Sequence, residues 1–231
     1  MNISTVHDDE VLLVNPDNEP IGQMDKFEAH EHPAKLHRCS SVWLINKKGQ
    51  VLLQERSAKK IVGAGWWANA ICGNLRPSEI YFDCAKRRLR EEIGILYGDL
   101  DGEIQPIYKF VYKAYCNDKY GEHEFDQVYV GSYNGKIIIN ENEVARVAWV
   151  NFDDLVTQIN LKTSIASPEQ TLIMDLDELQ QKTAPCEITI NEEKVFLAPW
   201  ACMMLKDLRL SEELKKLHDF TSNLRLSCYG P

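Results

Sequence analysis

The spacing of hydrophobic and polar residues along the chain predicts short strands joined by tight turns. Apolar runs at 11–14 and 20–22 flank a turn of Asn, Pro and Asp residues, which is typical of a small β-hairpin. Residues 40–46 and 51–54 are β-rich runs on either side of a Lys-Lys-Gly-Gln turn. We expect these two runs to pair as a second hairpin.

The same pattern of strands continues through the second half of the chain. Residues 106–117 and 123–133 alternate between apolar and polar positions and both contain aromatic side chains, which predicts a long hairpin. Residues 144–150 predict a further strand. A small hairpin is expected where 187–190 and 194–197 flank an Asn-Glu turn.

Helical periodicity is clearest in the middle of the chain. Ala85, Leu89 and Ile93 recur at intervals of four residues, Ser78 is the expected N-cap, and Gly94 is the expected end. Other helices are predicted within 24–31, 167–181, 199–209 and 211–221. Strands that outnumber helices, without a repeat or a linker, predict one α+β domain over residues 1–231: a mixed β-sheet flanked by helices.

Composition narrows the possible partners. The 231 residues are 44% hydrophobic and 26% charged, as in an ordinary globular enzyme, and a formal net charge of −9 argues against nucleic acid as the main partner. The seven cysteines include no C-x-x-C pair, so we expect reduced thiols.

The first residues lack a signal-like apolar segment, and no apolar run reaches the ~18 residues of a membrane span. A cytoplasmic protein without a membrane partner is therefore expected.

Two histidines and two glutamates are the candidate metal ligands. His30 and His37 bracket a short loop before the first long strand. Glu122 and Glu124 lie two residues apart on a predicted strand, so their side chains project from the same face. Imidazole and carboxylate groups suit a divalent ion such as Mn²⁺, Mg²⁺ or Zn²⁺. The alternative interpretation is that these are unrelated surface residues.

Four basic residues are candidates for binding an anionic substrate: Lys26, Arg56, Lys60 and Arg88. Arginine makes bidentate contacts with phosphate oxygens, and lysine supplies a point charge. Taken singly, each of the four is more typical of a solvated surface charge. They support a diphosphate site only if the fold brings them together.

A degenerate motif indicates where a diphosphate would bind. From Gly73 to Ile95 the chain reads G-x5-E-x7-R-R-L-R-E-E-I-G-I, which resembles the Nudix box, a loop-helix-loop whose glutamates hold a metal ion against a diphosphate. Arg88 stands where this box has a glutamate that a hydrolase relies on. Glu92 remains, and a Mg²⁺ ion bridging it to phosphate oxygens is the natural interpretation. Glu91 either shares this role or is solvated.

Cys72 lies immediately before this box. The following glycine, Gly73, lets the backbone turn sharply and expose the thiol, which indicates chemistry on the organic part of a diphosphate. The alternative is a buried cysteine that acts as a small hydrophobic residue. Likewise, Trp200 is typical of a residue that anchors the last helices, and Tyr112 of strand packing.

Together these residues resemble the type 1 isopentenyl-diphosphate Δ-isomerases, Nudix-fold enzymes that interconvert isopentenyl and dimethylallyl diphosphate. The resemblance covers Leu12 to Trp149 and resumes at Ala198. It rests on five motifs in the same order: the histidines His30 and His37, N-x-x-C-G ending at Gly73, R-R-x-R-x-E-x-G, E-x-E at Glu122 and Glu124, and Pro199-Trp200.

The resemblance implies a mechanism in which a proton is added at one carbon and removed at another. Glu124, hydrogen-bonded to Tyr112, would protonate the alkene; Trp200 would stabilise the carbocation; and Cys72, as a thiolate, would remove a proton. The remaining residues would form two ion sites and a diphosphate site. A divalent metal would bind at His30, His37, Glu122 and Glu124, and a Mg²⁺ ion at Glu92 would accompany the diphosphate. The diphosphate itself would be held by Lys26, Arg56, Lys60, Arg88 and Gly73.

Two departures from the family pattern affect this interpretation. Asn74 stands where the family has a third metal-binding histidine, and an amide oxygen is a harder, weaker ligand than imidazole, so the metal is expected to bind more loosely. An insertion at about 153–197, a helix plus a hairpin before the C-terminal helices, has no counterpart in shorter family members. It could be a lid or an oligomer contact, and our expectation is a passive surface elaboration.

Two other functions remain open at this point. A Nudix-type hydrolase of another organic diphosphate would need the acids Glu91 and Glu92. A non-catalytic diphosphate-binding protein would have a metal site that has lost its function because Asn74 replaces a histidine. All three interpretations share a small organic diphosphate as ligand, and the sequence leaves monomer and homo-oligomer equally open.

Overall fold

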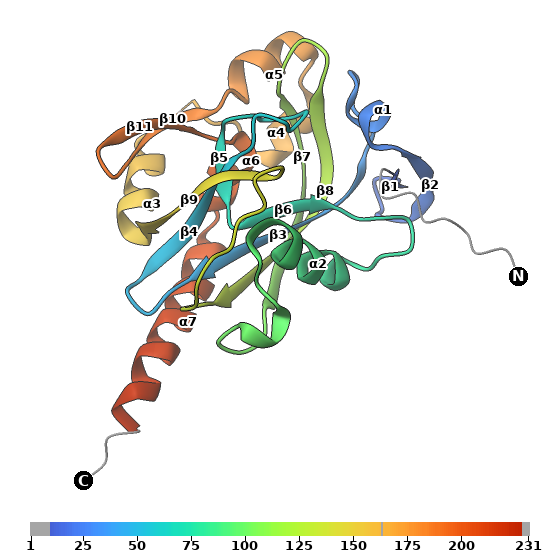
Figure 1. The fold of residues 1–231 in the computed structure, drawn as a ribbon. Helices are drawn as coiled ribbons and strands as arrows, with labels where there is room; N and C mark the ends of the chain where they lie inside the picture. Colours follow the sequence, from blue (N-terminus) through green and yellow to red (C-terminus); the bar gives the residue numbers. More distant parts are fainter. Residues whose placement is uncertain (1–9, 163, 228–231) are drawn as a thin grey trace, which may run out of the picture.

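The computed structural model describes residues 10–162 and 164–227, and it consists of strands in one mixed sheet with helices on both faces (Figure 1). The strands are β1 (Glu10–Val14), β2 (Pro20–Asp25), β3 (His37–Ile45), β4 (Gln50–Arg56), β5 (Trp67–Asn69), β6 (Ile71–Asn74), β7 (Gln105–Tyr115), β8 (Gly121–Ser132), β9 (Val144–Asn151), β10 (Cys186–Ile190) and β11 (Glu193–Leu197). The helices are α1 (Lys26–His30), α2 (Tyr81–Ile93), α3 (Phe152–Asn160), α4 (Pro168–Ile173), α5 (Leu176–Lys182), α6 (Pro199–Leu205) and α7 (Leu208–Ser227), with a 3₁₀ turn at Tyr97–Asp99. The predicted α+β class is confirmed.

Strand β3 is the centre of this sheet. It pairs in parallel with β8, which also forms the predicted long antiparallel hairpin with β7. On its other side β3 pairs antiparallel with β6. The predicted hairpin of β3 and β4 is present only next to its turn, where Ile45 pairs with Val51. Beyond that point β4 diverges from β3 and pairs with β5 and β9.

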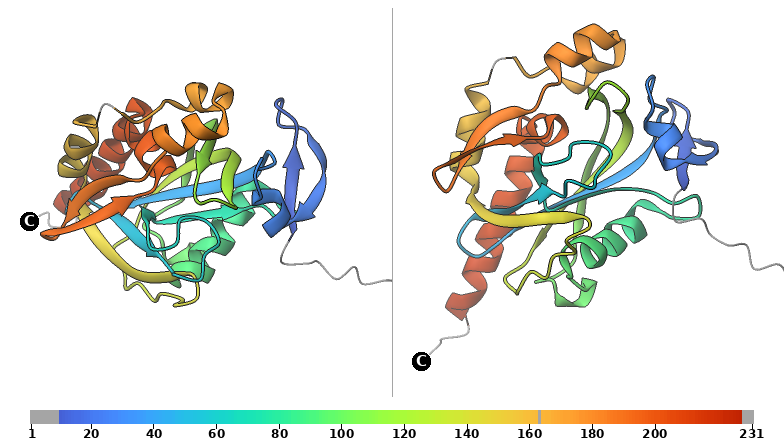
Figure 2. Two further views of the ribbon diagram at one scale, coloured as in Figure 1. Left: turned by 90° about the horizontal axis from the view of Figure 1, so that it is seen from above. Right: turned by 45° about the horizontal axis from the view of Figure 1, so that its top comes forward.

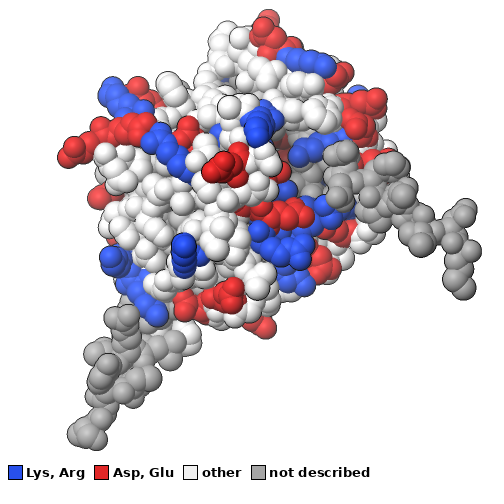
Figure 3. Space-filling view, viewed as in Figure 1, with Lys and Arg blue, Asp and Glu red and all other residues white. Residues whose placement is uncertain are grey.

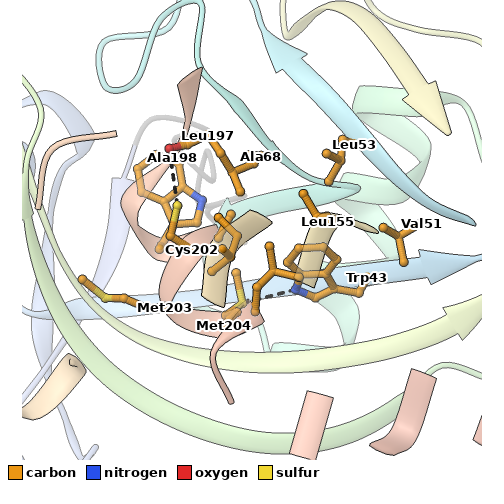
Figure 4. Close-up of a cluster of buried hydrophobic side chains, with 14 of the residues drawn as sticks. Trp43, Val51, Leu53, Ala68, Leu155, Leu197, Ala198, Cys202, Met203 and Met204 are labelled. Atoms are coloured by element: carbon orange, nitrogen blue, oxygen red, sulfur yellow. Dashed lines mark hydrogen bonds between the residues drawn. The ribbon is translucent and has the colours of Figure 1, made fainter. Parts of the chain in front are cut away.

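Strand alternation divides the core between the two faces of the sheet. Val42 and Leu44 pack on the side of α2, whereas Trp43 and Ile45 point to the side of α3, α6 and α7. Figure 2 shows α2 and these C-terminal helices on opposite sides of the sheet. The second cluster is drawn in Figure 4, where Trp43 Nε1 contacts Met204 Sδ at 3.4 Å. Both faces of β3 are therefore buried.

Helix α2 has the predicted apolar face but not the predicted start. Ala85, Leu89 and Ile93 are fully buried, and Gly94 ends the helix in the left-handed conformation with φ 69°. The N-cap is Ile80, which makes no side-chain capping bond, so the prediction of Ser78 was wrong. Within the described residues, no helix is long and apolar enough to cross a membrane.

The segment 153–197 is part of the core, so the expectation of a passive surface elaboration was wrong. Its helix α3 was not predicted, and Leu155 and Leu197 are fully buried in the cluster of Figure 4. The single helix expected at 167–181 is two helices, because Asp175 caps a new one. The hydroxyls of Thr171 and Thr183 accept hydrogen bonds from two backbone N–H groups of β7, those of Lys113 and Tyr115. Without this segment, these two groups at the edge of the strand would lack a protein partner.

The C-terminal helices were predicted, but with a different boundary. Helix α6 ends at Leu205 and α7 begins at Leu208, so the boundary predicted at 209–211 lies inside α7. The fully buried side chains of Leu210 and Leu214 join the core beside α6. Helix α6 is thereby fixed against the sheet, and its first turn carries Trp200.

Candidate active site

A cavity of ≈ 420 Å³ opens between α1, α2, β6 and β8, a size typical of a small-molecule site. Most of the residues singled out in the sequence line it, although they come from distant parts of the chain: Lys26, His30, Arg56, Lys60, Cys72, Gly73, Asn74, Arg88, Glu122 and Glu124. The other four predicted residues, His37, Glu92, Tyr112 and Trp200, lie behind this wall. The fold thus gathers candidate acids, bases and cations around one space.

The four predicted metal ligands form one buried cluster, with ligand atoms all within 4.8 Å of one another. The parallel register of β3 and β8 places His37 opposite Glu124, with His37 Nε2 3.5 Å from Glu124 Oε1. His30 Nε2 lies 3.2 Å from Glu122 Oε2. Two imidazoles and two carboxylates therefore face a common point.

The cluster is organised as a metal site would be. Nδ1 of His30 donates to the carbonyl of Lys26 at 2.6 Å, and Nδ1 of His37 donates to that of Lys35 at 2.7 Å. Such bonds to the backbone direct Nε2 inward. Glu122 Oε2 is buried and makes no hydrogen bond among the described residues: because Nδ1 of a neutral His30 carries the proton, its Nε2 presents only a lone pair to this oxygen. These ligand atoms fit a divalent ion, since a buried carboxylate oxygen without a hydrogen bond is otherwise unfavourable.

Asn74 reaches the same cluster. Its amide nitrogen lies 3.0 Å from His37 Nε2 and donates to Glu124 Oε1 at 2.8 Å. Rotation of the amide by half a turn would present Oδ1 to those positions. The structure thus brings Asn74 to the place that a third ligand would occupy.

Glu124 is also held from behind by Tyr112. The fully buried Tyr112 donates its hydroxyl proton to Glu124 Oε2 at 2.5 Å. Burial would raise the pKa of Glu124, but hydrogen bonds from His37 and Tyr112 and the charge of His37 lower it to about 2. Burial and the nearby Glu124 raise the pKa of Tyr112 well above its usual range. The proton of this pair therefore resides on Tyr112.

Trp200 lies behind Tyr112, and the two ring centroids are 6.5 Å apart. The guanidinium of Arg56 stands 5.3 Å from the centre of the indole ring, and the side chain of Trp200 is fully buried. The aromatic faces of Tyr112 and Trp200 are therefore next to the acid cluster. An electron-rich surface of this kind stabilises positive charge.

Cys72, which lines the cavity, contacts two polar side chains behind it, and one of these reaches a third. Its Sγ lies 3.3 Å from Sγ of Cys39. Oγ of Ser41 lies 3.4 Å from Cys72 Sγ and 2.6 Å from Asp126 Oδ2, so its single hydroxyl proton can be donated to only one of these two atoms at a time. The bond with Cys39 lowers the pKa of Cys72, but burial and the charges of Glu124 and Asp126 outweigh it and raise this pKa. The thiol, and not the expected thiolate, is favoured before substrate binds.

The four candidate cations lie around the same cavity. Lys26, Arg56, Lys60 and Arg88 all line the cavity, and Figure 3 shows basic and acidic side chains gathered over the region of α2. Burial, and then the charge of Arg56, lower the pKa of Lys60 to about 8. Gly73 is required for this arrangement, because a Cβ atom there would lie 2.5 Å from Cγ of Arg88. A dense cluster of positive charge is what a diphosphate needs.

Glu92 does not take the position expected for a metal ligand. Its side chain is almost fully buried; Oε2 accepts from Gln54 at 2.6 Å, and Oε1 accepts from Nε of Arg88 at 2.8 Å. Both oxygens are thus committed to the protein, behind the cavity wall. As they lie here, the oxygens of Glu92 do not fit a diphosphate-bound ion, whereas Glu91 and Glu143 line the cavity.

Four residues of the site were missed in the sequence. Cys39 and Ser41 follow His37 at intervals of two on β3, and Asp126 follows Glu124 in the same way on β8. Strand alternation could therefore have placed these three in the site. Glu143 lies in a turn before β9, and no pattern in the sequence indicates its role.

Comparisons with known proteins agree with this geometry. Residues 35–174 match the NUDIX domain. The chain is 34% identical over 152 residues to "Isopentenyl-diphosphate Delta-isomerase 2" of Aromatoleum aromaticum, covering 66% of this chain and 77% of the relative. The protein of the same name from Photorhabdus laumondii is 37% identical, covering 66% and 83%.

Among solved structures, DR0079 from Deinococcus radiodurans shares the fold. Its TM-score is 0.53 at 20% identity, covering 66% of this chain and 89% of that one.

Proposed function

This chain belongs to the isopentenyl-diphosphate Delta-isomerase family of NUDIX proteins, and we propose that the cavity lined by Cys72 and Glu124 is where it interconverts isopentenyl and dimethylallyl diphosphate. The observation that carries this assignment is the convergence of a thiol, a hydrogen-bonded acid pair and four cations on one cavity. The reaction needs all three: a proton donor, a proton acceptor and an anchor for the diphosphate.

The proton that reaches the terminal alkene carbon is delivered by Glu124. Glu124 is ionised in the free enzyme, so it first takes up the proton of Cys72, whose Sγ lies within 4.8 Å of a Glu124 oxygen. Glu124 then passes this proton to the alkene, while Tyr112 keeps its own proton and remains the hydrogen-bond partner at 2.5 Å. Addition of this proton places positive charge on the tertiary carbon. The indole of Trp200 stabilises that charge, an effect worth about 2 kcal/mol in a desolvated site.

Cys72 then removes a proton from the methylene group next to the cation. The thiol must first lose its own proton, which passes to Glu124, and burial opposes this ionisation in the free enzyme. The thiol of Cys39 donates a hydrogen bond that stabilises the thiolate, and the hydroxyl of Ser41 adds a second one when its proton turns from Asp126 to the sulfur. Loss of the methylene proton forms the new double bond, so the proton gained at one carbon balances the proton lost at the other.

Lys26, Arg56, Lys60 and Arg88 hold the diphosphate and thereby fix the five-carbon chain over the acid and the thiol. A divalent ion on His30, His37, Glu122 and Glu124, with Asn74 beside it, would supply positive charge that fixes the orientation of Glu124. Mn²⁺, Mg²⁺ and Zn²⁺ all suit this set of nitrogen and oxygen donors. We infer that a Mg²⁺ ion accompanies the diphosphate.

Incubation with isopentenyl diphosphate in deuterated water tests the proposal. We expect deuterium in both the recovered substrate and dimethylallyl diphosphate, because both proton transfers are reversible. Release of phosphate or pyrophosphate would instead identify a hydrolase. Unchanged, unlabelled substrate that still binds would identify a non-catalytic diphosphate-binding protein.

A further inference from the structure

Glu143 lies where the diphosphate is expected to bind. Its Oε2 atom is 2.5 Å from Nζ of Lys60 and 2.8 Å from an η nitrogen of Arg88. Both cations line the same cavity as Glu143. A carboxylate of the protein therefore occupies donors that a phosphate oxygen would also use, because Lys and Arg bind the two kinds of anion through the same N–H groups.

This arrangement is built into the fold. The side chains of Lys60 and Arg88 are only 12% and 11% exposed, whereas that of Glu143 is 28% exposed. The backbone carbonyl of Glu143 accepts from the amide of Ser57 at 3.0 Å, at the start of the loop that carries Lys60. The same turn is bound to α2, since the amide of Asn140 donates to the carbonyl of Glu92 at 2.9 Å. The turn thus joins the loop and the helix that supply the two cations.

Electrostatics explains why a carboxylate belongs here in the free enzyme. Lys26, Arg56, Lys60 and Arg88 form a cluster of like charge with little access to water, which is unfavourable without an anion. Burial would raise the pKa of Glu143, but the charges of Arg88 and Lys60 hold it far below its usual range. Glu143 is therefore ionised and partly neutralises the cluster.

We propose that Glu143 is an internal counter-ion that the substrate's diphosphate displaces from Lys60 and Arg88, and that returns when the product leaves. This inference rests on the proposed diphosphate site. Substrate and product carry the same diphosphate, so competition from Glu143 weakens the binding of both equally. Such uniform weakening raises KM and favours product release.

Calorimetric titration with inorganic pyrophosphate, at a fixed Mg²⁺ concentration, tests this competition. We expect Glu143→Gln to bind pyrophosphate about tenfold more tightly than the unsubstituted protein, as when one charge-assisted bond no longer competes. Glu141→Gln is the matched control: it removes the same charge from an exposed position in the same turn. Its affinity is expected to change by less than about twofold.

Two results would overturn the counter-ion role. Equal tightening in Glu143→Gln and Glu141→Gln would mean that only net charge matters, and weaker binding in Glu143→Gln would mean that Glu143 positions the cations instead of competing. Failure of the unsubstituted protein to bind pyrophosphate would refute the diphosphate site itself, and the deuterium experiment would then show independently whether isomerisation survives.

A steady-state measurement gives a second readout that a purely structural role would not produce. Glu143→Gln is expected to lower KM for isopentenyl diphosphate without raising kcat, whereas loss of structure would lower kcat and raise KM. If this variant does not fold, Glu143→Asp keeps the charge but shortens its reach, and it should bind pyrophosphate more tightly than the unsubstituted protein. Unchanged or weaker binding in a folded Glu143→Asp would contradict the proposal.

Discussion

The amide nitrogen of Asn74 lies 3.0 Å from Nε2 of His37, on the inward side of the buried His–Glu cluster. The same nitrogen donates to Glu124 at 2.8 Å. The amide nitrogen is thus in contact with two of the ligand atoms that would bind a metal ion. An ion must therefore displace the amide nitrogen or bind after the amide rotates, and either event opposes metal binding.

Asn74→His is accordingly expected to tighten the binding of Mn²⁺ by about tenfold or more, because an imidazole adds a ligand and removes this competition. Calorimetric titration of the metal-free protein measures the affinity without relying on activity. Asn74→Ala separates the two effects: it removes the competing amide and adds no ligand. Identical Mn²⁺ affinities for all three proteins would show that residue 74 does not act on the ion.

Replacement of Cys72 by alanine tests the proton acceptor. We expect turnover of isopentenyl diphosphate to fall by about 10²-fold to 10⁴-fold, the usual contribution of a general base. Pyrophosphate affinity should stay within about twofold, because the cations remain in place. Cys186→Ala, which removes a thiol from β10, is the control. Near-normal turnover in Cys72→Ala would refute the role assigned to this thiol.

Substitution of Trp200 tests the carbocation. Trp200→Phe keeps an aromatic face with a weaker quadrupole, and Trp200→Leu keeps bulk without one. We expect kcat to fall in the order Trp, Phe, Leu, with up to about a thirtyfold loss for Leu, equivalent to about 2 kcal/mol. Pyrophosphate affinity and melting temperature serve as controls. Equal kcat values for the two folded variants would leave Trp200 as a packing residue.

The affinity for substrate should depend on pH through Lys60. Burial and Arg56 lower the pKa of Lys60 to about 8 despite its ion pair with Glu143, so its positive charge is lost as pH rises through that value. KM for isopentenyl diphosphate is therefore expected to rise above pH 8, approaching about tenfold per pH unit. Lys60→Arg should remove this rise, because the guanidinium stays protonated. Superimposable profiles would show that another group titrates.

Local sequence patterns determined much of the fold. The spacing of Ala85, Leu89 and Ile93 defined the buried face of α2, and Gly94 defined its end. The hairpin of β7 and β8 also followed from alternation and one turn. Such features depend on residues close together in the chain, where the period of a helix or strand fixes which side chains share a face. The start of α2 was mispredicted because this helix begins after Ile80 without a side-chain cap, and the break between α4 and α5 was missed because the capping residue Asp175 lies within a continuous polar stretch.

Local sequence patterns predicted only part of the candidate site. The sequence indicated His30, His37, Glu122 and Glu124 as candidate ligands, but the contact of His37 with Glu124 depends on the parallel pairing of β3 with β8, whose paired residues are more than eighty positions apart. The position of Glu143 against Lys60 and Arg88, and the commitment of Glu92 to Gln54 and Arg88, were likewise decided by tertiary structure. A side chain's chemistry is set by its type, whereas its partner and its access to a ligand depend on how distant segments pack around the same space.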